Sequence, residues 1–123
     1  MSEPIGAKIK ILLIEDNYMF RDMYGIKIEQ AGFELFCAVS GDDGLKLMRE
    51  KKPNLVLMDV VMPDGDGFES LEEIRNDPEL IAIPVIMLTN LSNDEDRAES
   101  LRLGAKDYLI KACLLYTSPS PRD

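Results

Sequence analysis

The sequence predicts an α/β protein in which helices cover both faces of one parallel sheet. Five short, mostly apolar runs alternate with segments of helical period. The runs lie at residues 8–14, 33–39, 55–58, 85–88 and 107–111. Apolar strands bounded by Pro, Gly or acidic residues are typical of parallel sheets, which are buried on both faces. Their alternation with helices indicates a sheet wound on both sides.

The first helix is expected to follow the first strand directly. Residues 15–17, Glu-Asp-Asn, end that strand and supply N-cap candidates. The helix extends to about Gln30 and ends before Gly32, a usual residue just past a helix end. Apolar residues at spacings of 4 and 3 form its predicted inward face, and they are Met19, Met23 and Ile26.

The next three helices show similar signals. Ser40, with two aspartates in the following turn, opens the second helix. A loop at residues 64–67 precedes the third helix, and Pro78 follows it. A capping box at residues 92–95 opens the fourth helix, and Gly104 ends it. The expected inward residues of these helices are Leu45, Met48, Phe68, Leu71, Ile74, Ala98 and Leu101.

Composition and charge limit the function. A chain of 123 residues, 46% hydrophobic and 30% charged, forms one domain. Its 23 acidic against 14 basic residues disfavour direct binding to nucleic acid or to anionic membranes and suit a site that collects a divalent cation. No apolar run is long enough to span a bilayer, so we expect a cytoplasmic location.

Histidine and cysteine usage excludes further classes of chemistry. The chain contains no His, which removes Ser-His catalysis and His-metal sites. Its two cysteines form neither a disulfide framework nor a metal-type spacing. Cys37 lies in an apolar run, where we expect a buried thiol.

Polar side chains stand where the predicted strands end. Glu15 and Asp16 follow the first strand, Asp59 the third, Thr89 the fourth, and Lys111 the fifth. The carboxyl ends of parallel strands meet at one edge of a sheet, where open α/β folds bind ligands, so these side chains are expected to converge. Taken singly, the acidic residues also fit a simpler role, because they often only cap the next helix.

These residues, together with Met62-Pro63 and Gly67, resemble the receiver domain of bacterial two-component response regulators. The resemblance extends over residues 8–112. It implies a flavodoxin-like fold whose strands lie in the order 2-1-3-4-5. It also implies a signalling phosphoacceptor that catalyses only its own phosphorylation and dephosphorylation, rather than an enzyme.

The resemblance implies a role for each site residue. Asp59 would accept a phosphoryl group as an acyl phosphate. Thr89 and Lys111 would stabilise the phosphoryl oxygens. The ligands of a Mg²⁺ ion, a hard cation that prefers oxygen, would be Glu15, Asp16, Asp59 and the backbone carbonyl of Val61.

The resemblance further implies a two-state switch and its partners. Thr89 and Tyr108 would carry the signal to the face made by the fourth helix and the fifth strand. Core packing alone also accounts for Tyr108. The phosphoryl donor would be a sensor histidine kinase or a phosphotransfer protein. A homodimer through the switch face is expected in the full-length protein, without direct nucleic-acid binding by this domain.

Several positions depart from the family pattern. Glu15 replaces the commoner Asp with its role preserved, and Asn90 stands where a small residue such as Ala is usual. Ala112 replaces the usual Pro after the strand-end lysine, so no cis peptide is expected there. Val61 and Leu91 are apolar and cannot orient an attacking water, which predicts a long-lived phosphoryl group.

Two other classes of protein compete with this interpretation. A Mg²⁺-dependent phosphatase of the haloacid-dehalogenase type also uses a strand-end Asp, but it needs a second Asp two residues later, where this chain has Val61. A flavin-binding module needs a phosphate-cradling loop after the first strand, and residues 15–17 would repel a phosphate.

The two ends of the chain are expected to lie outside the domain. Residues 1–7 form a leader, and residues 113–123 resemble a translated sequencing adapter. No fifth helix is predicted after the fifth strand. An apolar sheet face would then stay uncovered, so we expect the 123-residue chain to be poorly stable or to aggregate.

Overall fold

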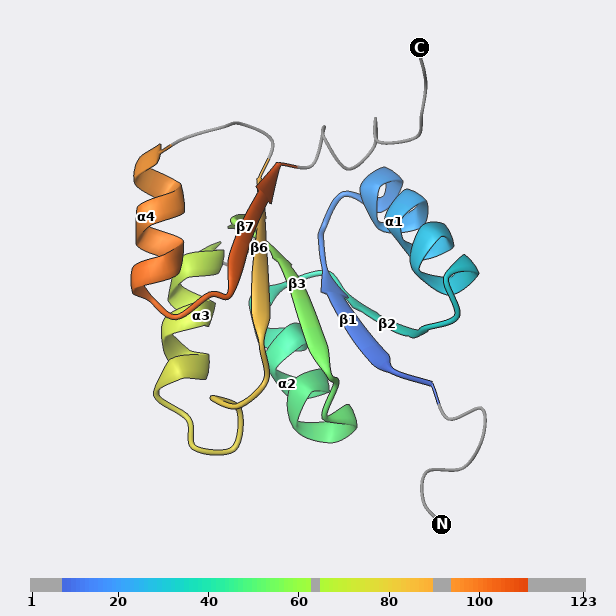
Figure 1. Ribbon diagram of the computed structural model, residues 1–123, viewed down its shortest axis with the longest axis horizontal. Coiled ribbons are helices and arrows are strands. Elements are labelled where there is room, and N and C mark those ends of the chain that lie inside the picture. The colour runs from blue at the N-terminus through green and yellow to red at the C-terminus, as the bar shows by residue number, and fades with distance from the viewer. Residues whose placement is uncertain (1–7, 63–64, 90–93, 111–123) are drawn as a thin grey trace.

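A computed structural model describes residues 8–62, 65–89 and 94–110. Its centre is a five-stranded parallel sheet in the order β2-β1-β3-β6-β7 (Figure 1). The strands are β1 (Lys10–Ile14), β2 (Glu34–Ala38), β3 (Leu55–Asp59), β6 (Val85–Thr89) and β7 (Asp107–Ile110). This confirms the predicted flavodoxin-like order 2-1-3-4-5 of the five main strands.

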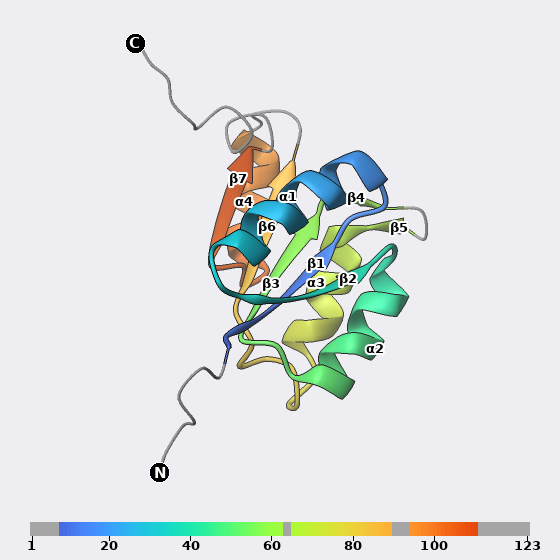
Figure 2. The same cartoon turned by 90° about the vertical axis from the view of Figure 1, so that its right-hand side faces the viewer.

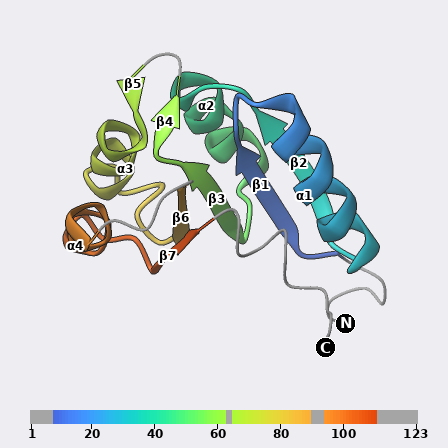
Figure 3. The ribbon, with the colours of Figure 1, turned by 90° about the horizontal axis from the view of Figure 1, so that it is seen from above.

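Helices flank both faces of the sheet. Helix α1 (Tyr18–Gln30) lies on one face, and three helices cover the other (Figures 1 and 3). Those three are α2 (Gly41–Lys51), α3 (Gly67–Arg75) and α4 (Asp94–Arg102). Four helices thus occupy the described part of the chain, and the region where a fifth helix is predicted to be missing lies outside it.

A short antiparallel pair follows β3, where the sequence predicted only a loop. Its strands are β4 (Val61–Met62) and β5 (Gly65–Asp66) (Figure 2). Val61 pairs with Asp66. The pair carries the chain from the end of β3 to the start of α3.

Alternate side chains of the central strands point to opposite faces and build two hydrophobic cores. Ile14, Met58 and Met87 pack with the inward residues of α2 and α3. Leu13 and Leu88 pack with Tyr24 of α1 on the other face. The predicted inward residues of α2 and α3 are confirmed, and they are Leu45, Met48, Phe68, Leu71 and Ile74.

The boundaries of α1 and α2 agree with the capping signals. The side-chain oxygen of Asn17 accepts hydrogen bonds from the backbone N–H groups of Met19, at 2.9 Å, and Phe20, at 3.3 Å. Ser40 caps α2 in the same way. Gly32, with a φ of +97°, follows α1 in the left-handed conformation that favours glycine. Helix α1 therefore begins immediately beyond the acidic end of β1.

The predicted inward face of α1 was wrong. Its residues Met19, Met23 and Ile26 are exposed, whereas Tyr24 and Gly25 are buried. The helix has two apolar stripes, and the one that includes the aromatic pair Phe20 and Tyr24 faces the sheet. Stacking of those rings, with centroids 5.8 Å apart, favours this orientation because large aromatic surfaces gain most from burial.

The predicted inward face of α4 was also wrong. Ala98 and Leu101 are exposed, and Ser100 is fully buried. The Ser100 hydroxyl donates a hydrogen bond of 2.8 Å to the carbonyl oxygen of Asp96, so this polar side chain is satisfied inside the protein. Leu103 and Ala105, just beyond the helix, complete the core there. Residues 92 and 93 of the predicted capping box lie outside the described residues.

Cys37 is exposed, which contradicts the expected buried thiol. It lies in β2, an edge strand that pairs only with β1 among the described strands. The edge of the sheet leaves the thiol partly open to solvent, and the adjoining burial still raises the pKa of Cys37.

Candidate functional site

Three acids that are far apart in the sequence meet at the carboxyl end of the sheet. Glu15, Asp16 and Asp59 each place a carboxylate oxygen within 4.8 Å of the others. The reason is topological, because β1 and β3 are adjacent parallel strands and both end there. Glu15 is fully buried and Asp59 is 5% exposed, while Asp16 is exposed to solvent. The predicted convergence of these acids is thus present.

Backbone contacts fix Glu15 at this edge. Its N–H donates to the carbonyl oxygen of Ala38, at the end of β2, over 2.9 Å. Its carboxylate oxygen Oε2 accepts a hydrogen bond of 3.1 Å from the N–H of Asn17. The same Asn17 caps α1, so the helix start and the buried carboxylate are held together.

Close packing fixes Asp59. The N–H of Val60 donates to the carbonyl oxygen of Leu88, over 2.9 Å, and the N–H of Gly67 donates to the carbonyl oxygen of Val60. A side chain at Gly67 would overlap the carbonyl oxygen of Asp59. Only glycine allows the start of α3 to approach the end of β3 this closely.

Tyr24, which was not among the predicted site residues, lies on the α1 side of the site. Its side chain is 4% exposed and packs against Leu13 and Leu88. Burial, followed by the negative charges of Glu15 and Asp59, raises the pKa of Tyr24 above its usual range. The Tyr24 hydroxyl therefore stays protonated at neutral pH, and the negative charges of Glu15 and Asp59 favour this state. Its position four residues after Phe20 is the available sequence signal.

The remaining candidate residues fall at neighbouring positions or outside the described chain. Thr89 is buried at the end of β6, one residue after Leu88, which pairs with Asp59. Tyr108 in β7 is buried, and its hydroxyl has no hydrogen-bond partner in the structure as described. Val61 lies in β4, two residues beyond Asp59. Lys111, Asn90, Leu91 and Ala112 lie outside the described residues.

Arg21 contacts the acidic loop, residues 15–17, directly. No pattern in the sequence pointed to this residue. Its guanidinium Nη1 donates to the carbonyl oxygens of Glu15, at 2.9 Å, and Asp16, at 3.4 Å. These contacts join α1 to residues that precede it in the chain. A single sequence carries no signal for such a bond, because it depends on how the helix leaves the strand.

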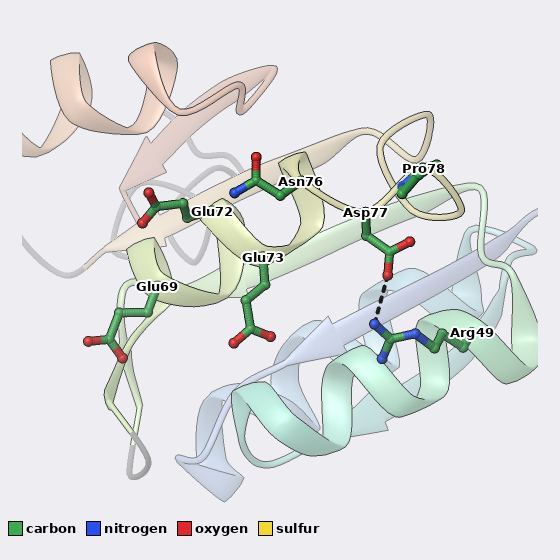
Figure 4. A pocket seen from close by; sticks show the side chains of 7 residues that line it. All are labelled: Arg49, Glu69, Glu72, Glu73, Asn76, Asp77 and Pro78. Carbon is green, nitrogen blue, oxygen red and sulfur yellow. Dashed lines mark hydrogen bonds and ion pairs between the residues drawn. The ribbon is translucent and has the colours of Figure 1, made fainter.

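An open hollow of about 620 Å³ lies elsewhere, between α2 and α3. Figure 4 shows its lining side chains, with Arg49 and Asp77 in an ion pair of 2.7 Å. The other lining residues include Glu69, Glu72 and Glu73. The ion pair joins α2 to the segment just beyond α3. None of the three acids lines this hollow, so it is not the candidate site.

The chain matches the response regulator receiver domain over residues 11–115. It is 41% identical to the transcriptional regulatory protein AfsQ1 of Streptomyces coelicolor, over 82% of this chain and 44% of that protein. It is 38% identical to the protein PilH of Pseudomonas aeruginosa, over 83% of this chain and 84% of that protein. The chain spans less than half the length of the transcriptional regulators that it matches.

Solved structures agree with this match. The chemotaxis protein CheY4 of Vibrio cholerae superposes with a TM-score of 0.80 at 28% identity, covering 90% of this chain and 96% of that one. The Mn²⁺-bound form of the response regulator Rcp1 superposes with a TM-score of 0.75 at 26% identity, covering 93% and 99%.

These findings decide between the classes of protein considered from the sequence. They give no support to a phosphatase of the haloacid-dehalogenase type, because the matches are response regulators, whose receiver domains are generally not classical enzymes. Among the described residues, no helix has the length and hydropathy that crossing a membrane requires. The chain belongs to the response regulator receiver domain family of two-component signalling.

Proposed function

We propose that Asp59 accepts a phosphoryl group from a phosphohistidine of a sensor histidine kinase or phosphotransfer protein in the cytoplasm. A carboxylate oxygen of Asp59 forms the new P–O bond while the P–N bond to the donor imidazole breaks. The imidazole leaves with the bonding electron pair and takes up a proton. The observation that carries this proposal is the cluster of Glu15, Asp16 and Asp59 within 4.8 Å.

The donor atoms of the cluster fit a Mg²⁺ ion. Glu15, Asp16 and Asp59 offer carboxylate oxygens, the hard ligands that Mg²⁺ prefers, and the backbone carbonyl of Val61 is the fourth proposed protein ligand. The related Rcp1 has been solved with Mn²⁺, another divalent cation. When bound, the ion would neutralise charge on the phosphoryl oxygens and help to orient them. Thr89 would donate a hydrogen bond to one phosphoryl oxygen, and Lys111 would pair with another.

Exposed apolar side chains beside the acidic loop support a protein as the phosphoryl donor. Met19, Met23 and Ile26 are 59%, 42% and 55% exposed, and they line α1 from its first turn, immediately after the acids. An exposed apolar stripe of this kind is typical of a surface that packs against another protein. A donor that delivers a phosphoryl group to Asp59 must cover this end of the molecule.

The proposed response is a switch through Thr89 and Tyr108 to the face formed by α4 and β7. The buried Tyr108 hydroxyl has no hydrogen-bond partner among the described residues. This supports the proposal, because an unsatisfied buried hydroxyl destabilises the inward conformation of the side chain. We propose a homodimer through this face in the full-length protein, without direct binding of nucleic acid by this domain. The apolar residues Val61 and Leu91 would leave the acyl phosphate long-lived.

Incubation with acetyl phosphate and Mg²⁺ tests the phosphoacceptor directly. Intact-protein mass spectrometry should show one added phosphoryl group, absent in Asp59→Asn and present in Asp22→Asn, a matched change at an exposed aspartate of α1. Hydrolysis of the donor without accumulation on the protein would favour phosphatase chemistry. Labelling that persists in Asp59→Asn would contradict the assignment of Asp59.

A further inference from the structure

Arg21 reaches from α1 back to the loop that carries two of the three acids. A single nitrogen, Nη1, donates to the carbonyl oxygens of two successive residues, Glu15 at 2.9 Å and Asp16 at 3.4 Å. Both acceptors are backbone oxygens, so these two bonds hold the loop through its main chain and not through its carboxylates. Hydrogen bonds from a charged donor are stronger than neutral ones.

The remaining contacts of this loop fix Glu15 better than Asp16. Glu15 is fully buried, and its N–H is bonded to Ala38. Asp16 is exposed, and its carbonyl oxygen accepts from Arg21. The side chain of Arg21 is itself half-buried beside the edge strand, where it lines a hollow of about 250 Å³ with Leu35 and Cys37. The side chain that bonds to Asp16 is thus itself held against the folded domain.

Repulsion among the three carboxylates is a reason for Arg21 to hold the loop in place. Glu15, Asp16 and Asp59 gather three carboxylates within 4.8 Å, and like charges at this separation repel. A loose loop would relax by moving Asp16 outward, and a cation would then have to draw it back. Groups that are held in place beforehand bind more tightly, because less ordering accompanies binding.

We propose that Arg21 is a positioning residue that holds Glu15 and Asp16 ready for a divalent cation. This inference rests on the proposed function of the acidic cluster. In this role Arg21 acts through the loop backbone, to which both of its bonds are made. A lysine at this position keeps the charge but lacks the rigid planar fork of donors, so it should replace the arginine only in part.

Calorimetric titration of the 123-residue protein with Mg²⁺ tests this role. Arg21→Ala should weaken the Mg²⁺ affinity about tenfold and Arg21→Lys about threefold, as expected for the loss of one charge-assisted hydrogen bond or part of it. Arg49→Ala is the matched control, because it removes the ion pair with Asp77 away from the acids. Its Mg²⁺ affinity should equal that of the wild type.

A second readout needs no bound cation. In the presence of EDTA, amide hydrogen exchange at Glu15 and Asn17 should be faster in Arg21→Ala than in the wild type and unchanged in Arg49→Ala. The N–H groups of both residues are hydrogen-bonded in the structure, so their exchange reports on the order of the loop.

The outcomes separate this proposal from the proposed function. Equal Mg²⁺ affinity in Arg21→Ala and the wild type would overturn the positioning role, and so would an equal loss in Arg49→Ala. If Arg21→Ala fails to fold, Arg21→Lys decides, because an unchanged affinity overturns the role and a threefold loss supports it. A wild-type protein that binds no Mg²⁺ would overturn the proposed function instead. The exchange comparison would then still decide whether Arg21 orders the loop.

Discussion

The substitution Gly67→Ala measures how tightly the acidic site is packed. Gly67 begins α3, and a Cβ built there would overlap the carbonyl oxygen of Asp59 and lie 2.8 Å from Cε of Met87. The end of the flexible Met87 side chain is able to move aside. The Asp59 oxygen belongs to the backbone of β3, so relief of the overlap requires the end of that strand or the start of α3 to shift.

Both the stability and the chemistry should respond to this shift. Overpacking of this kind costs about 1–3 kcal/mol, a large share of the roughly 5–15 kcal/mol that stabilises a typical domain. The shift also moves Asp59 relative to Glu15 and Asp16. A displacement of about 1 Å at a reacting group lowers a rate by on the order of a hundredfold. We therefore expect phosphorylation of Gly67→Ala to slow more than its loss of folded protein explains.

Urea unfolding followed by circular dichroism, and the phosphorylation rate with acetyl phosphate, measure the two effects. Gly25→Ala is the control, since its Cβ would lie 3.0 Å from the movable Cδ2 of Leu35. Alanine in a helix interior gains up to about 1 kcal/mol over glycine, so this control should stay close to wild type in both assays. A Gly67→Ala protein with the stability and rate of the wild type would refute the packing argument.

Three further substitutions test other parts of the structure. Tyr108→Phe should raise the free energy of unfolding by about 1 kcal/mol, because it removes a buried hydroxyl with no partner among the described residues; urea midpoints check this. The hydrogen bond from Arg49 lowers the pKa of Asp77 in the folded protein below its ordinary value of 3.8. The bond therefore stabilises the fold above pH 3.8, and this stabilisation is lost as the pH falls through the lowered pKa of the folded state. Asp77→Asn should make thermal melts less sensitive to acid, and an unchanged acid dependence would argue against this pair. Burial raises the pKa of Tyr24, so the folded protein keeps a proton that an unfolded tyrosine releases near pH 10.0, and stability falls above that pH. Tyr24→Phe should lessen this alkaline loss, and an identical alkaline melt would contradict it.

Local signals in the sequence were sufficient for the five strands of the main sheet and for two helix starts. Asn17 and Ser40 cap α1 and α2 as predicted, because a cap depends on the residue and its immediate neighbours. The meeting of Glu15, Asp16 and Asp59 was predictable for a different reason. Parallel topology brings strand ends together whatever the side chains between them, so strand order alone placed the acids.

Features that depend on tertiary packing were not predictable in the same way. Helix α1 carries two apolar stripes. The spacing predicted that the stripe with Met23 faces the sheet, whereas the stripe with Tyr24 is the buried one. Spacing alone cannot rank two stripes when only contact with the sheet decides between them. Burial of Ser100 is tolerated because its hydroxyl donates to the carbonyl oxygen of Asp96, and a polarity pattern does not reveal such a bond. The bonds of Arg21 likewise depend on the angle at which α1 leaves β1.

Anomalous diffraction from crystals soaked in Mn²⁺ tests most directly whether the three acids form one cation site. We expect a single strong peak within coordination distance of the carboxylates of Glu15, Asp16 and Asp59, and its loss in Asp59→Asn. No peak at this edge of the sheet, or a peak that Asp59 does not touch, would contradict the assignment.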